Sequence, residues 1–220
     1  LSLALASVML VGMMSVGASA VNASDFTDAD EIVNKDAVST MTALGIINGK
    51  EDGSYFDPTG TVTRAEMAKM LCVAINGGVD PVLGVKDTPT FTDIKGHWAE
   101  SYIEYCAANG IIAGRGNNKF DPTGTVSATE AAKMLLGVLG YNAEKSGLVG
   151  NDWAINTNVL ANQNGLYKNL SNLNANTLLT RDNAAQMIYN ALDANMVELN
   201  AAGNYTTSQY SYTGTCLLYT

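Results

Sequence analysis

The stretch FDPTGTV occurs twice in the chain, at Phe56–Val62 and again, letter for letter, at Phe120–Val126. Each copy holds a proline, which fixes the direction of the backbone, and a glycine, which permits a tight turn. The valine that ends each copy can pack against the first turn of a following helix. Seven identical residues at two distant places indicate two structural units of the same kind.

The similarity extends on both sides of this stretch. Phe-Thr-Asp at residues 26–28 returns at residues 91–93. TRAEMAKML at residues 63–71 returns as SATEAAKML at residues 127–135. The repeated segment is therefore long enough to be a whole structural unit that buries one face against its neighbour.

A weaker third copy follows the second. Asp-Trp-Ala at residues 152–154 resembles His-Trp-Ala at residues 97–99, and LTRDNAAQM at residues 179–187 resembles the TRAE segment. Self-similarity of this kind is typical of stacked repeat units. The predicted units are residues 24–80, 88–142 and 150–195.

Each unit is predicted to fold as helix, loop and helix. In the first unit, apolar residues of Ala29–Leu44 lie on one stripe, and Gly45 follows where the helix should end. Thr63 and Glu66 are spaced as a capping box, which predicts a second helix that runs to about Ile75. The equivalent starts in the other units are Ser127 with Glu130, for a helix to about Leu139, and Thr180. The sequence therefore predicts a mainly α fold.

Two arginines stand where helix formation alone does not favour them. Arg64 and Arg181 each occupy the first position of a capped helix, where the positive end of the helix dipole disfavours a cation by about 0.3–1 kcal/mol. One interpretation is an ordinary solvated arginine. The other is an anion site, formed by the guanidinium and the free N–H groups of the helix end. Ala128 takes the equivalent place in the second unit.

Composition excludes several classes of function. The chain has 12 Lys and Arg against 21 Asp and Glu, a net charge of −9, which argues against a nucleic-acid partner. A single histidine, His97, and the absence of a Cys-x-x-Cys pair leave no expected metal site or cofactor. The acidic residues fall at caps and turns, so we expect no catalytic residues.

Two features leave alternatives open. The acidic loop Glu51–Asp57 is a candidate calcium site. It lacks the ligand spacing of an EF-hand, so a turn is the better interpretation. Cys72 and Cys106 lie in predicted helices among apolar residues, which favours buried thiols. A disulfide between them is the alternative, because pairing cannot be read from sequence.

The two ends of the sequence carry further expectations. Residues 1–20 hold no charge and end in Ala18-Ser19-Ala20, which predicts a signal peptide without its n-region rather than a membrane anchor. We therefore expect an exported protein with no membrane partner after cleavage. Residues 196–220 are expected to begin a further region that continues past this sequence; within it, residues 204–212 alternate polar and aromatic residues like a strand.

Taken together, the Phe-x-Asp start, the Gly-Ile-x-x-Gly helix end, the Asp-Gly-x-Phe-x-Pro loop and the TRAE helix start resemble the S-layer homology domain. The resemblance covers about Ser24 to Asn195, with a degenerate third copy. It implies three repeats packed around a pseudo-threefold helical bundle. It also implies a cell-wall or S-layer location and binding to secondary cell-wall polysaccharide, often through a pyruvate ketal. Other S-layer subunits are a further expected partner.

The resemblance also assigns candidate binding residues. The TRAE arginine of the family maps onto Arg64 and Arg181, and Lys50 and Arg115 are expected either to add positive charge to the same grooves or to be solvated. The helix-cap residues of the three units would also lie at the site: Thr63, Glu66, Ser127, Glu130 and Thr180. Trp98 and Trp153 are expected to pack in the core or between units rather than against a sugar. The main functional expectation is anchoring of a surface protein; the alternative is the anchoring module of an exported wall-active enzyme.

Overall fold

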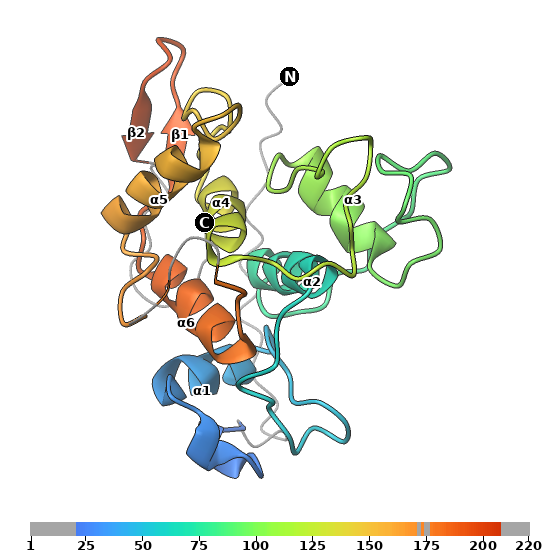
Figure 1. The fold of residues 1–220 in the computed structure, drawn as a ribbon, viewed down its shortest axis with the longest axis vertical. Coiled ribbons are helices and arrows are strands. Elements are labelled where there is room, and N and C mark those ends of the chain that lie inside the picture. Colours follow the sequence, from blue (N-terminus) through green and yellow to red (C-terminus); the bar gives the residue numbers. More distant parts are fainter. Residues whose placement is uncertain (1–20, 171–172, 174–176, 208–220) are drawn as a thin grey trace.

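The described part of the chain is mainly helical, as predicted. The computed structural model describes residues 21–170, 173 and 177–207, so the predicted signal peptide lies outside the described residues. Two short 3-10 turns come first, η1 (Ala23–Asp25) and η2 (Ala29–Glu31). The helices and strands are α1 (Lys35–Ala43), α2 (Arg64–Ile75), α3 (Glu100–Ala108), α4 (Ala128–Val138), α5 (Trp153–Gln163), α6 (Arg181–Leu192), β1 (Val197–Leu199) and β2 (Tyr205–Thr207) (Figure 1).

The second helix of each unit begins where its cap residues place it. At α2, the Thr63 backbone N–H donates to Glu66 Oε2 at 2.7 Å, while the Glu66 N–H donates to Thr63 Oγ1. Ser127 and Glu130 make the same reciprocal pair at α4. At α6 only half of this arrangement exists, because Thr180 Oγ1 accepts from the N–H of Asn183, which has no carboxylate to return the bond. Local capping chemistry therefore sets these three helix starts.

The first helix is shorter than predicted. A helix over Ala29–Leu44 was expected, but Ala29–Glu31 forms the turn η2 and α1 begins only at Lys35. Asn34, the residue before α1, donates from its backbone N–H and its side-chain Nδ2 to the carboxylate of Asp182, at 3.1 and 2.6 Å. The Asp182 carboxylate of α6 therefore satisfies the N–H donors of Asn34 at the start of α1. The pattern of apolar residues in the sequence does not predict this contact.

The repeated Phe-Thr-Asp and FDPTGTV segments are two halves of one folded loop. In the first unit, the Asp28 carboxylate accepts from the backbone N–H groups of Phe56 and Asp57, at 2.9 and 2.7 Å. The Phe26 and Phe56 rings pack with their centroids 5.3 Å apart. The second unit repeats the arrangement: Asp93 accepts from the N–H groups of Phe120 and Asp121, and the Phe91 and Phe120 rings lie 5.5 Å apart.

A side chain at the glycine of FDPTGTV would displace the aspartate side chain of the same loop. A Cβ on Gly60 would lie 2.0 Å from Asp57 Oδ2, and one on Gly124 would lie 2.2 Å from Asp121 Oδ2. Both aspartates have a positive φ, 60° and 62°, a conformation that aspartate tolerates better than most residues. The two loops have the same sequence because both fold in the same way, with the aspartate side chain against the glycine.

A closed ring of backbone hydrogen bonds joins the ends of the three loops. Val62 N–H donates to Leu179 O at 2.9 Å, Leu179 N–H to Val126 O at 3.0 Å, and Val126 N–H to Val62 O at 2.9 Å. All three residues immediately precede the cap of a second helix. Each unit thus bonds directly to both of the others.

The helices pack in the same cyclic order. The second helix of each unit contacts the first helix of another: α2 with α3, α4 with α5, and α6 with α1. In Figure 1, α2 and α4 lie near the middle of the molecule, and α4 also contacts α6. The predicted pseudo-threefold symmetry of the bundle stays a prediction.

The hairpin β1–β2 folds back onto the second unit. The two strands are antiparallel, with Glu198 opposite Thr206. Val197 N–H donates to Leu139 O at 2.8 Å, and a Cβ on Gly140 would lie 1.9 Å from Val197 O, so only glycine fits there. The strand expected at residues 204–212 is observed at Tyr205–Thr207, and residues 208–212 lie outside the described part. No helix among the described residues has the length and apolar character needed to cross a bilayer.

Candidate functional site

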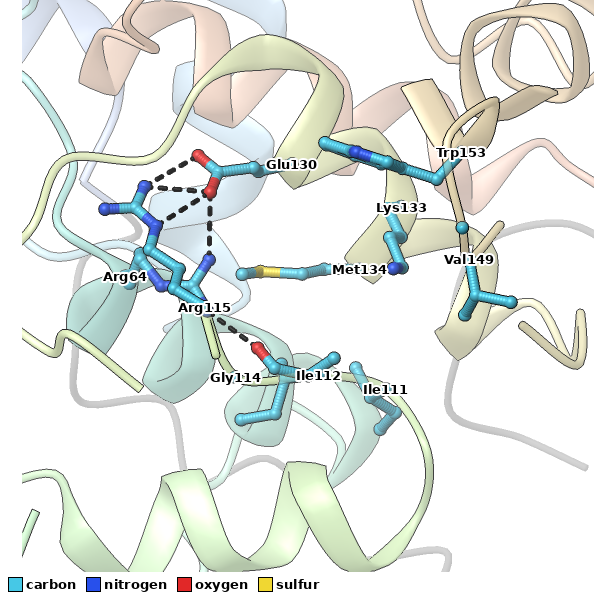
Figure 2. A pocket seen from close by; sticks show the side chains of 12 residues that line it. Arg64, Ile111, Ile112, Gly114, Arg115, Glu130, Lys133, Met134, Val149 and Trp153 are labelled. Carbon is cyan, nitrogen blue, oxygen red and sulfur yellow. Dashed lines mark hydrogen bonds and ion pairs between the residues drawn. The ribbon is translucent and has the colours of Figure 1, made fainter. Parts of the chain in front are cut away.

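A cavity of about 590 Å³ lies between the second and third units, with Arg64 of the first unit in its wall. Loop 111–115, helix α4 and the start of α5 form the other walls. The apolar lining includes Ile111, Ile112, Met134, Val149 and Trp153, and the charged lining is Arg64, Arg115, Glu130 and Lys133. Figure 2 shows Arg64, Arg115 and Glu130 linked on one side, with Lys133, Val149 and Trp153 on the other. The cavity is therefore apolar over much of its wall and carries three cations against one carboxylate.

Arg64 is buried, with only 3% of its surface exposed. Its Nε donates to Phe120 O and its Nη2 to Ala113 O, both at 2.8 Å, and its Nη1 lies 3.2 Å from Glu130 Oε1. The guanidinium carbon also lies 4.4 Å from the centroid of the Phe120 ring. The interpretation of Arg64 as a solvated surface arginine is wrong. Its side chain binds the FDPTGTV loop of the second unit, which offsets the cost of a cation at a helix start.

Glu130 joins two arginines at the cavity wall. Besides Arg64, it accepts from Arg115 Nη2 at 2.8 Å, and Arg115 Nη1 pairs with Asp121 at 2.5 Å. Burial raises the pKa of Glu130, but the Ser127 N–H and the two arginines outweigh it and hold that pKa below its ordinary value. Partial burial likewise lowers the pKa of Arg115, while Glu130 and Asp121 raise it overall. Arg115 is thus ion-paired rather than free in solvent.

Lys133 differs from the other cations of the cavity, because no carboxylate within the described ranges forms an ion pair with it. Its Nζ lies 5.2 Å from the centroid of the Trp153 ring. Burial, and then the charge of Arg64, lower the pKa of Lys133. This ammonium group is therefore the cavity's most available partner for an anion. Neither Lys133 nor Trp153 was among the predicted binding residues, although the lysine recurs at the matching position, Lys69, of the repeated segment.

The other predicted binding residues lie at a different interface. Arg181 donates from Nε to Phe56 O at 2.7 Å and from Nη2 to Asn48 O at 2.8 Å, with its guanidinium carbon 5.0 Å from the centroid of the Phe56 ring. Lys50 forms an ion pair with Asp57 in the same loop. Arg181 therefore holds the loop of the first unit just as Arg64 holds that of the second. The structure brings Arg64, Arg115, Ser127 and Glu130 together, and it places Lys50 and Arg181 in a separate group.

The two tryptophans have different surroundings. Trp153 is half-buried in the cavity wall. Trp98 is 56% exposed and packs beside His97 and Tyr102, at centroid distances of 5.5 and 6.4 Å. The expectation that Trp98 packs in the core or between units is therefore wrong, and its replacement should cost much less stability than a core truncation.

A metal-binding arrangement receives no support from the described residues. Within residues 21–170, 173 and 177–207, no group of three or more His, Cys, Asp or Glu side chains is placed to hold a metal ion. In the acidic loop, Asp52 Oδ1 accepts from the Ser54 N–H at 3.0 Å, which is a turn contact.

The fold and the cavity define a class of protein: a mainly helical module built of repeated units, with a candidate ligand site where units meet. Comparison with known families gives this class a more specific description. Residues 25–68 and 90–132 match the model of the S-layer homology domain. The third repeat stays a prediction.

Relatives of the chain include surface proteins and proteins named as enzymes. It is 32% identical to an S-layer protein of Bacillus licheniformis over 50% of this chain, and 29% identical to a cell surface protein of Thermoanaerobacter kivui over 86% of it. It is 28% identical to exoglucanase XynX of Acetivibrio thermocellus over 66% of this chain. The matched regions are 12%, 24% and 14% of those proteins, respectively, so the chain spans only a small part of each relative.

Proposed function

We propose that this chain anchors an exported protein to the bacterial cell wall by binding an anionic wall polysaccharide. The observation that carries the proposal is a cation-lined cavity beside two segments that match the S-layer homology domain, in which Lys133 has no ion-pair partner among the described residues. Relatives named S-layer, cell surface and cell wall proteins support a location at the cell surface. The net charge of −9 means that the anion is held by local cations against the overall field.

A pyruvate ketal on an amino sugar has the chemistry that the cavity suits. Its carboxylate would accept from Lys133, its methyl group would contact apolar wall residues such as Ile112 and Met134, and a sugar ring would pack on Trp153. Arg64 and Arg115 would add positive potential through N–H groups that their structural contacts leave unused. The caps Ser127 and Glu130 would position these arginines.

The remaining predicted residues form a second candidate site in this proposal. Arg181 and Lys50 would serve the groove beside the loop of the first unit, with Thr63, Glu66 and Thr180 as the nearby helix caps. Residues 150–195 would be the degenerate third repeat, which supplies Trp153 to the first site. Other S-layer subunits are a proposed further partner.

The alternative is that this module anchors a wall-active enzyme. The similarity to exoglucanase XynX motivates it, but no observation on the described residues favours it over the main proposal. An assay of wall hydrolysis by the protein in its natural length would detect such an activity.

Binding to purified cell walls tests the proposal. We expect the protein to sediment with walls and to lose binding when acid strips the wall polysaccharide. Lys133→Gln should weaken binding by about 1.5–3 kcal/mol, the range for a hydrogen bond to a charged group, with little change in unfolding free energy. Lys145→Gln, at an exposed lysine outside the cavity, is the matched control. Undiminished binding to stripped walls, or by the Lys133 variant, would contradict the proposal.

A further inference from the structure

Two cysteines meet at the contact between the first and second units. Cys72 lies on α2 and Cys106 on α3, and their exposed fractions are 1% and 0%. Both are free thiols, and their Sγ atoms are 3.3 Å apart. The sequence left open whether they are separate buried side chains or a pair; the structure makes them direct neighbours.

The geometry allows a bond between them. The sulfur atoms of a disulfide lie about 2.0 Å apart, so these need to approach by only about 1.3 Å, within reach of small side-chain rotations. In the thiol form, each sulfur lies near a backbone carbonyl of the opposite helix: Cys72 near Tyr102 O at 3.5 Å and Cys106 near Ala68 O at 3.6 Å. Both sulfurs therefore point across the interface.

The equivalent interface between α4 and α5 shows that packing alone does not require cysteine here. By the register of the repeats, Cys72 corresponds to Leu136 on α4, and Cys106 to Ala161 on α5. Leu136 and Ala161 are both completely buried. An ordinary apolar pair therefore fills this position between the second and third units.

We propose that Cys72 and Cys106 form a disulfide that ties the first unit covalently to the second. The proposal rests on the proposed export, since disulfides persist in oxidising compartments, but it does not depend on the wall ligand. The oxidant would be a disulfide-bonded protein or small molecule. One cysteine thiolate attacks its disulfide and releases one thiol; the second thiolate then attacks the mixed disulfide and releases the other. Two cysteine protons are lost, and two electrons reduce the oxidant to two thiols.

The timing of this reaction follows from the burial of the pair. The hydrogen bond with Cys72, and then burial, raise the pKa of the Cys106 thiol. Because only the thiolate attacks a disulfide, the fully folded dithiol should react slowly. The bond should therefore form while the chain folds outside the cytoplasm, before α2 and α3 close over the sulfurs.

Peptide mapping tests the proposal directly. The chain, fused to a complete signal peptide and carrying Cys216→Ser, is secreted from a bacterial host; free thiols are alkylated in denaturant, and the protein is digested with trypsin without reductant. We expect the peptides spanning residues 70–86 and 96–115 to be joined in most molecules, lighter by two hydrogen atoms than the separate pair. Alkylation of both cysteines in most molecules would overturn the proposal.

Thermal unfolding gives a second readout. The bond would close a 34-residue separation, and reduction should lower the melting temperature by about 5–15 °C. The double variant Cys72→Leu/Cys106→Ala copies the apolar pair of the α4–α5 interface, so it should fold with a melting temperature that reductant does not change. A wild-type melting temperature equally insensitive to reductant would count against the disulfide. Wall binding by the double variant should match wild type, so a failure of the disulfide and a failure of the proposed function remain distinguishable.

Discussion

Arg64 serves the fold at a position where helix formation alone would not choose a cation. The helix dipole opposes it by about 0.3–1 kcal/mol. Four contacts oppose this dipole cost. Arg64 donates to two carbonyls of the second unit, forms an ion pair with Glu130 and packs over the face of the Phe120 ring. Each hydrogen bond of a charged group contributes about 1.5–3 kcal/mol, so the contacts outweigh the dipole. The same residue lines the cavity, so its structural role and its proposed binding role involve one side chain.

Replacing Arg64 should therefore destabilise the protein. We expect Arg64→Ala to lower the free energy of unfolding by about 2–4 kcal/mol, because it leaves the Phe120 and Ala113 carbonyls and the Glu130 carboxylate without a partner. Arg64→Lys should recover only part of this, since an ammonium cannot reproduce the planar fork. Denaturant unfolding measures both, with Lys145→Ala as the control. A variant as stable as wild type would show that these contacts contribute nothing to stability.

The sequence predicted where Arg64 stands but not what it touches. Its place just inside a capped helix follows from neighbouring residues, whereas the groups it binds belong to a loop that begins about fifty residues later in the chain. Lys133 was missed for a similar reason: a lysine on a helix looks like any solvated lysine until burial and Trp153 are known. Its recurrence at Lys69 was the available signal, but recurrence alone also fits a solvated helix face.

At the scale of elements, prediction succeeded where structure is local. The starts of α2, α4 and α6 follow from side chains three residues apart, and the loop turns follow from proline, aspartate and glycine. The start of α1 was wrong because Asp182, far along the chain, binds the residue before it. The Phe-Thr-Asp segment was recognised as a repeat, but the role of its aspartate as partner of the FDPTGTV loop required the folded chain.

That role makes Asp93 a source of pH-dependent stability. Burial opposes ionisation, but the N–H groups of Phe120 and Asp121 outweigh it and lower the pKa of Asp93 from its ordinary 3.8. Since the folded state has the lower pKa, the contribution is present above about 3.8 and is lost as the pH falls through the folded pKa.

We expect Asp93→Asn to lower the unfolding free energy by about 1–3 kcal/mol at neutral pH, because its amide NH₂ would face one of the two backbone N–H donors that the carboxylate binds. The difference from wild type should shrink as the pH falls below about 4. Denaturant titrations at a series of pH values measure this, with Asp87→Asn, at an exposed aspartate, as the control. A difference that stays constant with pH would contradict the assigned role.

At the scale of the whole molecule, the closed ring of hydrogen bonds separates this protein from a linear stack of repeats. In a linear stack each unit contacts only its neighbours, so a terminal unit can be removed and the rest still folds. Here the third unit contacts the first through the Val62–Leu179 bond, through Arg181 and through the packing of α6 on α1. Each of the three units is therefore a neighbour of the other two.

Deletion of the third unit tests this closure. A chain that ends at residue 145 loses α5, α6 and the hairpin, which exposes the apolar face of α1 and leaves the loop carbonyls of Asn48 and Phe56 without Arg181. We expect the whole protein to unfold in one cooperative thermal transition when helix content is followed by circular dichroism. We expect the chain that ends at residue 145 to show no such transition, because its first unit should not fold without the third. A chain that ends at residue 196 keeps α1 to α6 and lacks β1, β2 and the residues after them, so it should retain a sharp transition. If the chain ending at residue 145 melts as sharply as the longer one, the units fold independently, and the contacts between the first and third units are dispensable for folding.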